Sequence, residues 1–373
     1  MEKTAPMAPM HIAFCSDSNY AMPTGIAMIS ICENNRDIPI VFHLVLTDEG
    51  KPKEKQDAAL NPLKDIAIRY GKRLNHYSIT ADRLSSFVCA GASHVSTTAF
   101  ARLFLPDILA SDIPKLLYLD GDLIVTQSLK DLWETQFPAN CPLAAVPDYN
   151  MNLSYVRHNS LLPEGVIYFN SGVLLMNLDL WRKEHLSKQI VDVAGKHKFP
   201  FLDQDAINYT LQNRILRLSF TYNGQVLAWH PQAQWRISVD MQTYDEICRL
   251  KESNSMPVIL HYITANKPWK KGECLWREEW DKFKRLSIWK NMERQSLVTS
   301  FDKSEIYSAF IDAYWGDPEL MQLGVKSMLP FYYACLHFKN KKKIFKVCFS
   351  PIKCMIWILE KTYKLKARKT FKQ

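Results

Sequence analysis

The sequence predicts an α/β fold with a mostly parallel sheet and helices on both faces. Short apolar runs that are typical of strands alternate with longer segments that have a helical pattern. The clearest of these runs lie at residues 11–15, 40–46 and 115–119. Such alternation places a helix between successive parallel strands, so that the helices come to cover both faces of the sheet.

The remaining elements follow the same alternation. We expect helices at residues 20–33, 51–70, 97–109, 178–196 and 203–212, and further strands at 76–79, 143–146, 166–176 and 258–262. From about Trp276 the pattern changes to helical segments that are rich in Tyr, Trp and Phe. We therefore predict three parts: a sheet-containing domain at 1–275, a small helical C-terminal region at 276–336 and a basic tail at 337–373.

The composition is that of a folded globular protein, because 47% of the residues are hydrophobic and 23% are charged. The first ten residues contain one lysine and none of the apolar core of a signal peptide. No run approaches the ~18 apolar residues of a membrane-spanning helix. The nine cysteines form no C-x-x-C pair, which argues against a disulfide framework or a zinc site. We therefore expect a cytoplasmic location.

Positive charge is concentrated in the tail. Residues 337–373 contain twelve Lys or Arg and one acid, Glu360, whereas the whole chain carries +9, so the body is close to neutral. The lysines alternate with bulky apolar residues such as Phe345 and Trp357, a pattern that favours an anionic membrane surface. A merely solvated tail is the simpler alternative. Nucleic-acid binding is disfavoured by the neutral body and by the lack of a nucleic-acid motif.

Two aspartates, Asp120 and Asp122, directly follow the strand at 115–119. With one residue between them, both carboxylates can converge on one cation, and hard oxygen ligands suit Mg²⁺ or Mn²⁺. Such a cation would bridge the oxygens of a diphosphate and act as a Lewis acid on the leaving group. Two acids in a solvated turn are also common, so this pair alone is weak support for a metal site.

A histidine and a lysine near the last strand strengthen the metal hypothesis. His261 ends an apolar run, and an imidazole completes a carboxylate site for Mn²⁺. Lys267, six residues later, can neutralise the charge that builds up on a departing diphosphate. Taken singly, a buried core histidine and a surface lysine would explain the same two residues.

Three further polar groups lie at strand or helix ends. Asp17, Asn19 and Tyr20 follow the first strand and can bind a nucleotide base and ribose, although an N-cap role explains Asp17 as well. The second group is the segment 169–172, which lies between apolar runs. Its Gly172 allows close approach of the backbone to a ligand, or it marks a β-bulge or turn. The third group is Asp203, Gln204 and Asp205, which open a predicted helix, where acids often serve only as caps.

Together and in this order, these residues resemble glycosyltransferase family 8. The resemblance runs from His11 to about Trp269. It rests on FCSDSNYA (14–21), TTAFARLFLP (97–106), KLLYLDGDLIV (115–125), YFNSGVLLMNLDLW (168–181), DQDAIN (203–208) and HYITANKPW (261–269). Within the family, the sequence is most similar to bacterial lipopolysaccharide core α-glucosyl- and α-galactosyltransferases, which carry a C-terminal extension of this kind.

The resemblance implies a GT-A fold, a nucleotide-sugar domain of Rossmann-like layers, for residues 1–275. It implies that Asp120, Asp122 and His261 hold Mn²⁺ or Mg²⁺. It also implies the residues that bind the UDP-sugar: Asp17, Asn19, Tyr20, His94, Arg102, Asp120, Gly121, Asp122, Asp148, Asn170, Gly172, Asp203, Gln204 and Lys267. One departure lies at Ile263 and Thr264, where family members often have Cys-Gly, and it puts the backbone contacts to phosphate in doubt.

The activity implied by the resemblance is transfer of glucose or galactose from UDP-glucose or UDP-galactose to the lipopolysaccharide core, with retention of configuration. The catalytic candidates are Gln204, Asp148, Asp205 and Lys267. A double displacement needs a nucleophile on the face of the sugar opposite the leaving group, and the residue expected near that face is Gln204, an amide and a poor nucleophile. We therefore favour a front-face reaction, in which the acceptor hydroxyl enters on the side from which UDP leaves. Asp148 and Asp205 stay candidates for a double displacement.

The enzyme would lie on the inner face of the inner membrane as a peripheral protein. Two alternatives stay open. One is a family 8 transferase that acts on another glycan or on a protein acceptor. The other is a catalytically silent glycan- or lipid-binding protein on the same fold.

Overall fold

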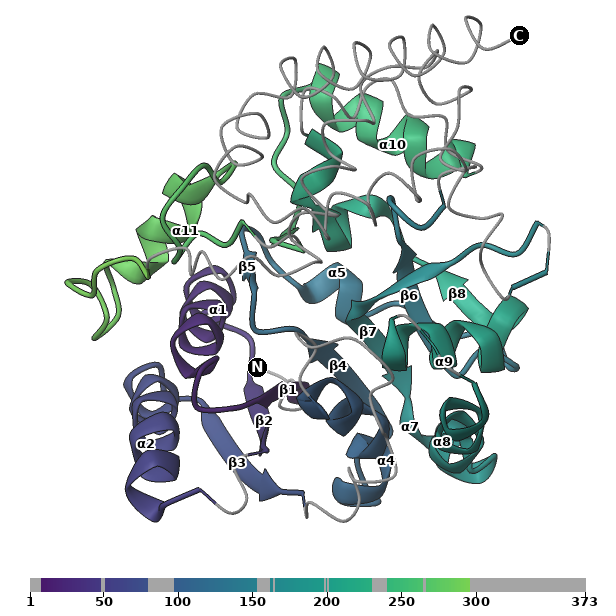
Figure 1. The fold of residues 1–373 in the computed structure, drawn as a ribbon, viewed down its shortest axis with the longest axis horizontal. Helices are drawn as coiled ribbons and strands as arrows, with labels where there is room; N and C mark the ends of the chain where they lie inside the picture. The colour runs from purple at the N-terminus through teal and green to yellow at the C-terminus, as the bar shows by residue number, and fades with distance from the viewer. Residues whose placement is uncertain are drawn as a thin grey trace, which may run out of the picture. The chain divides into compact units, whose positions relative to one another are not determined.

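A computed structural model describes residues 8–47, 51–79, 97–152, 162–163, 165–197, 199, 201–229, 240–263 and 266–295 (Figure 1). All of these residues fall in one compact unit. His94, the predicted helices beyond residue 295 and the basic tail at 337–373 lie outside the described residues. Among the described helices, none has the length and apolar character needed to cross a membrane.

A seven-stranded sheet forms the centre of this unit. Its order is β3 (Arg73–Ser78), β2 (Ile40–Leu46), β1 (Met10–Ser16), β4 (Lys115–Leu119), β7 (Phe169–Asn177), β6 (Leu143–Pro147) and β8 (Ile215–Arg217). All neighbouring pairs are parallel except those of β7, which runs antiparallel to both β4 and β6. The predicted α/β class with a mostly parallel sheet is confirmed.

Strands β1, β2 and β4 are apolar on both sides because both faces of the sheet are covered. β1 pairs along its whole length with β2, and Ile12 lies opposite Leu117 of β4. Because these strands are parallel, their carboxyl ends meet at one edge of the sheet, where ligands bind in folds of this class. The polar residues after β1 and β4 therefore lie at the same edge.

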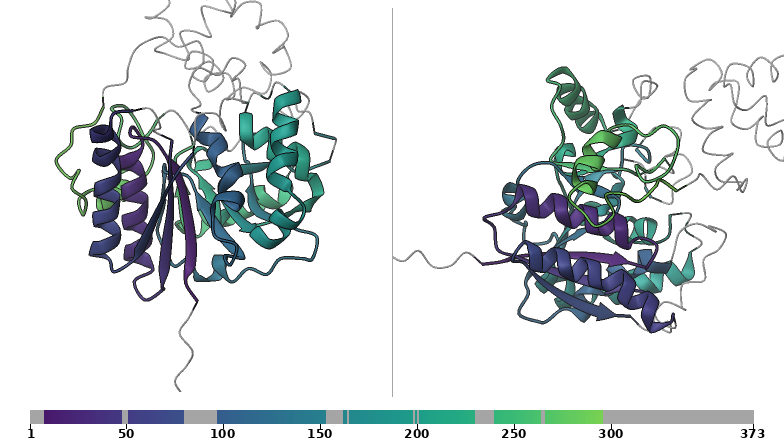
Figure 2. Two further views of the ribbon diagram at one scale, coloured as in Figure 1. Left: turned by 90° about the horizontal axis from the view of Figure 1, so that it is seen from below. Right: turned by 90° about the vertical axis from the view of Figure 1, so that its left-hand side faces the viewer.

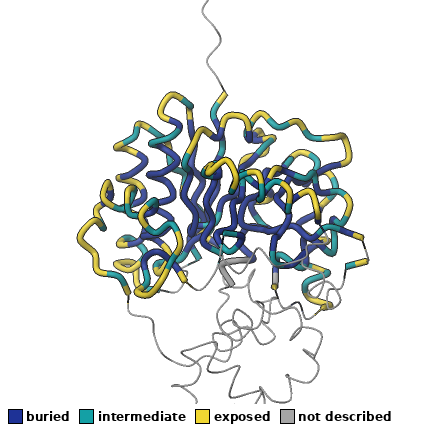
Figure 3. Tube along the Cα trace, turned by 90° about the horizontal axis from the view of Figure 1, so that it is seen from above, coloured by how far each residue is buried: buried dark blue, intermediate teal, exposed yellow. Residues whose placement is uncertain are grey.

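Helices cover both faces of the sheet, as predicted (Figure 2, left). One layer consists of α1 (Ala21–Asn34) and α2 (Lys53–Arg69). The other consists of the 3₁₀ helix η1 (Thr97–Phe104), α4 (Leu105–Ile108), α7 (Leu178–Lys183), α8 (Leu186–Lys196) and α9 (Leu202–Leu211). Phe100, Trp181 and Ile207 of this second layer belong to one buried cluster with Leu116 and Leu174 of the sheet. Figure 3 shows the strands buried at the centre and exposed residues around the outside.

A second, three-stranded sheet lies beside the end of β4. It consists of β5 (Leu123–Val125), β10 (Ile259–His261) and β9 (Gly224–Gln225). β10 is antiparallel to β5 and parallel to β9, and His261 pairs with both Leu123 and Gln225. Ile26 of α1 and Trp280 of α11 (Arg277–Lys284) share a buried cluster with this sheet. The small sheet thus fixes His261 next to the turn that follows β4.

The other elements are short or peripheral. They are α5 (Lys130–Trp133), α10 (Met241–Glu252) and the 3₁₀ helices η2 (Gln212–Arg214), η3 (Phe220–Asn223) and η4 (Val226–Trp229).

Two helices that were predicted from the sequence have a different form in the structure. The helix expected at 97–109 is mostly 3₁₀, and the one expected at 178–196 is two helices. They are separated at His185, whose φ of 53° is left-handed and ends the right-handed helical path.

Candidate metal and sugar-donor site

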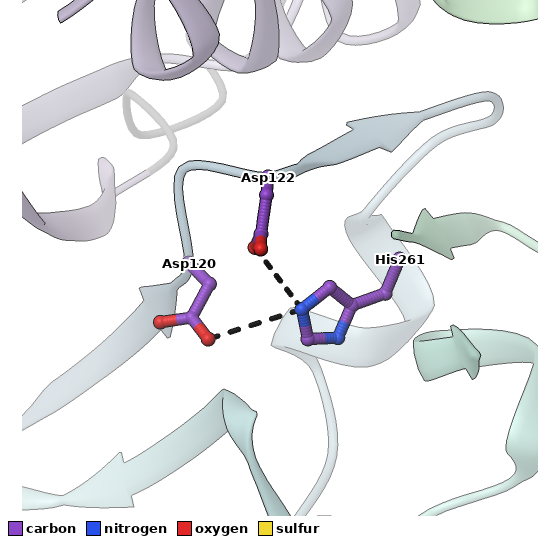
Figure 4. Close-up of side chains that lie close together, drawn as sticks. All are labelled: Asp120, Asp122 and His261. Carbon is purple, nitrogen blue, oxygen red and sulfur yellow. Dashed lines mark hydrogen bonds and ion pairs between the residues drawn. The ribbon is translucent and has the colours of Figure 1, made fainter. Parts of the chain in front are cut away.

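Two carboxylates and an imidazole converge where the two sheets meet (Figure 4). Asp120 and Asp122 lie in the turn between β4 and β5, and the backbone N–H of Asp120 donates to the carbonyl of Gly172 at 2.8 Å. The Nε2 atom of His261 lies 3.1 Å from Oδ1 of Asp122 and 3.8 Å from Oδ2 of Asp120. Residues far apart in the sequence therefore present one nitrogen and two oxygens to a common point.

This donor set fits a divalent cation. Carboxylate oxygens and one imidazole nitrogen suit Mn²⁺ well, and the oxygens suit Mg²⁺. The floor of the site is Gly172: a Cβ atom there would lie 2.3 Å from Cε1 of His261 and 2.8 Å from Oδ2 of Asp120. Glycine thus lets the backbone of β7 pass close to the side chains of His261 and Asp120. The predicted close approach of this backbone to a bound ligand stays a prediction.

Lys267 is buried next to the predicted metal ligands. Its Nζ atom donates to Oδ2 of Asp122 at 2.6 Å and to the backbone carbonyl of Tyr262. Burial alone would raise the pKa of Asp122, but the charge of Lys267, followed by that of His261, outweighs burial and holds the pKa below its ordinary value. Asp122 is therefore ionised and available as a ligand, with a fixed positive charge beside it.

Arg102 supports Asp120 from the other side. Its guanidinium lies 3.2 Å from Oδ1 of Asp120 and 3.1 Å from Oδ2 of Asp203, and it donates to the carbonyl of Ser171 at 2.6 Å. It also lies 4.6 Å from the ring centroid of Tyr118, whose hydroxyl donates to the same Asp120 oxygen at 2.6 Å. Burial raises the pKa of Asp203 to about 6, although Arg102 opposes this shift. Arg102 thus connects η1 to the metal-site turn and to α9.

A network of amides and one carboxylate lies beside the metal site. The Nδ2 group of Asn170 donates to Oδ2 of Asp148 at 3.0 Å and to Oε1 of Gln204 at 3.2 Å. Gln204 in turn donates to the same Asp148 oxygen at 3.2 Å and accepts the backbone N–H of Ser171 at 2.9 Å. Asn170 and Asp148 are buried. The structure thus brings these predicted residues together as one polar wall.

Asp205 belongs to a separate arrangement. Its Oδ1 atom accepts the hydroxyl of Tyr168 at 2.5 Å, and its Oδ2 atom accepts the backbone N–H of Phe201 at 2.7 Å. Phe201 directly precedes α9, so Asp205 satisfies an amide group at the start of this helix. Burial raises the pKa of Asp205. Its catalytic role stays a prediction.

The polar residues after β1 lie at the same sheet edge. The Oδ1 atom of Asp17 accepts the backbone N–H groups of Asn19 at 2.9 Å and Tyr20 at 3.0 Å, so it closes a turn ahead of α1. The N-cap residue of α1 is Tyr20, so the N-cap role considered for Asp17 is wrong. The ring of Tyr20 meets that of Trp269 edge-on, with centroids 5.8 Å apart, and 37% of Tyr20 is exposed. Tyr20 therefore retains exposed surface that a planar base could stack on.

Comparison with known proteins identifies the family. Residues 11–273 match the family described as Glycosyl transferase family 8. The protein is a member of glycosyltransferase family 8.

Several curated relatives of this family 8 protein are lipopolysaccharide enzymes. The lipopolysaccharide glucosyltransferase WaaO of Escherichia coli K12 is 27% identical over 76% of the chain and 79% of that protein. The lipopolysaccharide 1,3-galactosyltransferase of Salmonella typhimurium is 25% identical over 69% of the chain and 72% of that protein. The predicted similarity to these transferases is confirmed.

Another relative is a larger protein. Glycosyltransferase GlyA of Streptococcus pneumoniae serotype 4 is 31% identical over 74% of the chain, and the match spans 35% of GlyA. Among solved structures, the galactosyltransferase LgtC in complex with donor and acceptor sugar analogs has a TM-score of 0.62 at 24% identity. That match covers 76% of this chain and 99% of LgtC. The family 8 protein therefore has the predicted GT-A fold.

Some residues of the family 8 site were not predicted from the sequence. Asn223 is fully buried at the end of η3, and its Oδ1 atom lies 2.8 Å from Nδ1 of His261. Ser171 supplies its carbonyl to Arg102 and its N–H to Gln204. Gln225 is fully buried and accepts the N–H of Tyr149 at 2.9 Å. No spacing pattern marks these residues, because their partners lie far away in the sequence.

Proposed function

We propose that this family 8 glycosyltransferase uses Mn²⁺ or Mg²⁺ to transfer glucose or galactose from a UDP-sugar to a lipopolysaccharide core oligosaccharide, with retention. The observation that carries this proposal is the convergence of Asp120, Asp122 and His261 beside the buried Lys267. The named activities of the lipopolysaccharide relatives support the donor and the acceptor.

The metal site and two buried, positively charged side chains, Lys267 and Arg102, would bind the diphosphate. Asp120, Asp122 and His261 would hold the metal ion, which supplies Lewis-acid stabilisation of the leaving phosphate when it is bound. Lys267 places a fixed positive charge next to the same carboxylates. Arg102 is also buried and charged, and it lies against Asp120. Preorganised charges of this kind stabilise the negative charge that develops on the UDP.

The two ends of the donor would bind on opposite sides of the metal site. Asp17, Asn19 and Tyr20 would bind uridine and ribose, with Tyr20 stacking on the base. The polar wall formed by Asp148, Asn170 and Gln204 would bind the hydroxyl groups of the sugar. Its buried hydrogen-bonding groups suit a polyhydroxylated ligand, because each lost contact would leave a polar group unpaired. Asp203 and Gly172 would complete this pocket.

A front-face reaction is the mechanism that the geometry favours. The acceptor hydroxyl would approach the anomeric carbon on the side from which UDP leaves. The new C–O bond forms as the bond between the anomeric carbon and the phosphate oxygen breaks, and the hydroxyl proton passes to an oxygen of the departing phosphate. Gln204, an amide held by Asp148 and Ser171, would position the donor sugar.

The two candidate nucleophiles for double displacement are both hydrogen-bonded. Asp148 accepts Asn170 and Gln204 at Oδ2 and the N–H of Met151 at Oδ1. Asp205 is bound at both oxygens. Hydrogen bonds stabilise a carboxylate and lower its nucleophilicity, which supports the front-face reaction over a covalent intermediate. Mass-spectrometric detection of a glycosyl adduct on either aspartate would contradict this mechanism.

The basic tail and the lipopolysaccharide relatives support a lipopolysaccharide acceptor. The basic tail at 337–373 would hold the protein on the anionic inner face of the inner membrane, where a lipid-linked core oligosaccharide is available. Another acceptor is the second candidate, because the relatives include GlyA and the general stress protein A of Bacillus subtilis, whose names mention no lipopolysaccharide.

A transfer assay distinguishes these acceptors. The purified protein would be incubated with UDP-glucose or UDP-galactose and with defined truncated lipopolysaccharide cores, with glycan and peptide acceptors in parallel. We expect transfer to a core acceptor and an α-linked product by NMR. Transfer only to a non-lipopolysaccharide acceptor would overturn the acceptor assignment and leave the donor chemistry intact.

A further inference from the structure

The metal-site histidine is held from behind by a buried asparagine. The Nε2 atom of His261 faces the two carboxylates, and its Nδ1 atom lies 2.8 Å from Oδ1 of Asn223. Asn223 is fully buried at the end of η3, and its Nδ2 group donates to Oδ1 of Asn170 at 2.9 Å. The three side chains thus form a continuous chain of hydrogen bonds from the metal site into the polar wall.

The direction of each bond in this chain follows from one backbone group. The N–H of Gly172 can only donate, and it donates to Oδ1 of Asn170 at 2.9 Å. That atom is therefore an acceptor, so Asn223 must present its NH₂ group to Asn170 and its carbonyl oxygen to His261. The carbonyl oxygen in turn requires a hydrogen on Nδ1 of His261.

A second backbone group fixes the other end of the network in the same way. The N–H of Ser171 donates to Oε1 of Gln204, so the amide nitrogen of Gln204 donates to Asp148. Asn170 lies between the two ends and donates its own NH₂ group to Asp148 and Gln204. All of these assignments are mutually consistent. Strand β7 thus orients the side chains of both the metal ligand and the sugar pocket.

We infer that Asn223 is a positioning residue that keeps a hydrogen on Nδ1 of His261 and turns Nε2 toward the cation site, where a bound cation would take its lone pair. This inference rests on the proposed metal site. Partners that bind the non-ligating nitrogen of a metal-bound histidine fix the ring orientation and its tautomer, and their loss weakens metal binding by about 10–100-fold. Asn223 has this relationship to His261 and also ties the ligand to Asn170.

Three variants separate positioning from simple packing. Asn223→Leu keeps the volume and removes both hydrogen bonds. Asn223→Asp keeps an acceptor for the Nδ1–H group but removes the donor to Asn170. Asn35→Leu is the matched control: Asn35 is also buried, donates to the carbonyl of Ile31 at 2.9 Å and accepts the N–H of Leu129 at 2.8 Å, but it contacts none of the residues of the metal site.

The first measurement is ¹⁵N NMR of histidine-labelled protein without metal or nucleotide, with His261→Gln used to assign the ring signals. We expect a hydrogen on Nδ1 of His261 in the parent, in Asn35→Leu and in Asn223→Asp, and its loss in Asn223→Leu. Nε2 lies 3.1 Å from Oδ1 of Asp122, so a hydrogen on Nε2 in the metal-free protein is compatible with the inference. A parent ring without a hydrogen on Nδ1 would overturn the inference, as would a hydrogen that stays on Nδ1 in Asn223→Leu. If the Leu variant does not fold, loss of the Nδ1 hydrogen in Asn223→Asp would overturn it.

The second measurement is the affinity for Mn²⁺ alone, by calorimetry on the full chain. Asn223→Leu should weaken Mn²⁺ binding by about 10–100-fold, whereas Asn35→Leu should bind as the parent does. Parent-like affinity in Asn223→Leu, or no Mn²⁺ binding by the parent, would overturn the inference. Neither measurement uses a UDP-sugar. A parent that binds Mn²⁺ and has the expected hydrogen on Nδ1 but releases no UDP would therefore contradict the proposed function and leave the positioning role intact.

Discussion

The ammonium group of Lys267 lies 2.6 Å from the Oδ2 atom of Asp122, while the other oxygen of this carboxylate faces His261. One side chain of the metal site is therefore shared between the ligand cluster and a buried positive charge. A cation bound at Asp122 and the diphosphate that it carries would both lie within reach of this lysine.

Replacing Lys267 separates its role from that of the metal ligands. Lys267→Met removes the fixed charge, and we expect turnover to fall by about 10²–10³-fold, as when one preorganised electrostatic group is lost. Mn²⁺ affinity should not fall, because Asp122 loses a competing cation. Lys267→Arg is the control and should retain more activity than the Met variant. Parent-like turnover in Lys267→Met, measured with saturating donor, would contradict the role of this residue.

A methyl group at residue 172 should disable the site. The Cβ atom of Gly172→Ala would lie 2.3 Å from His261 and 2.8 Å from Asp120, so at least one ligand must move. Displacement on the scale of an ångström costs about 10²-fold in rate. Mn²⁺ titration and UDP release would both report this loss.

A glycine elsewhere in the same protein provides the matched control. Gly195 lies in α8, and a Cβ atom there would meet no atom within 4 Å. Gly195→Ala should therefore raise the free energy of unfolding by about 0.5–1 kcal/mol and leave activity unchanged. Full activity in Gly172→Ala would refute the close packing that we describe around the metal ligands.

Much of the fold could be predicted because continuous apolar runs mark strands that are buried on both faces. The runs at 40–46 and 115–119 coincide with β2 and β4. The direction of β7 could not be predicted, because a strand covered on both faces has the same apolar run whether it is parallel or antiparallel. The break between α7 and α8 also escaped prediction, since no glycine or proline marks the left-handed conformation of His185.

The site could be predicted only where a local signal exists. Asp120 and Asp122 directly follow a strand, and His261 ends another, so their positions at strand ends pointed to the site. Asn223 carries no such signal, because its partner His261 is 38 residues away and reaches it only through the small sheet. That sheet was not expected, since β5 and β9 are too short to be distinguished from the loops around them.

Acid should destabilise the protein through a buried histidine, His43, which lies away from the site. The Nε2 atom of His43 lies 2.9 Å from His11, and its Nδ1 atom lies 3.1 Å from the hydroxyl of Tyr77. Burial, with repulsion from His11, lowers the pKa of His43 to about 4. The unfolded chain binds this proton near pH 6.5, so the stability from the neutral ring is complete above pH 6.5 and is lost as pH falls toward 4.

Chemical denaturation at several pH values tests this expectation. Between pH 6.5 and 4, the free energy of unfolding of the parent should fall more steeply than that of His43→Gln, by up to about 1.4 kcal/mol per pH unit. Gln cannot titrate but can still donate and accept hydrogen bonds. Equal slopes for the two proteins would show that His43 is not a neutral buried ring in the folded state.

The basic tail makes a prediction of its own. A chain truncated after residue 336 loses twelve Lys or Arg. Each basic residue near an anionic surface contributes about 1 kcal/mol to binding, so the truncated chain should no longer sediment with anionic vesicles. UDP release from the donor should stay near the parent rate. Neutral vesicles give the baseline for this comparison. If the truncated chain sediments with anionic vesicles as much as the parent does, the tail does not bind the membrane.

The most direct test of the central claim is UDP release from a panel of UDP-sugars, in Mn²⁺ and in EDTA. The parent should release UDP from UDP-glucose or UDP-galactose with Mn²⁺ and lose this activity in EDTA, and Asp122→Asn should be about 10²–10³-fold slower. No release from any donor, even with core lipopolysaccharide acceptors added, would contradict the transferase assignment and favour a silent binding protein on this fold.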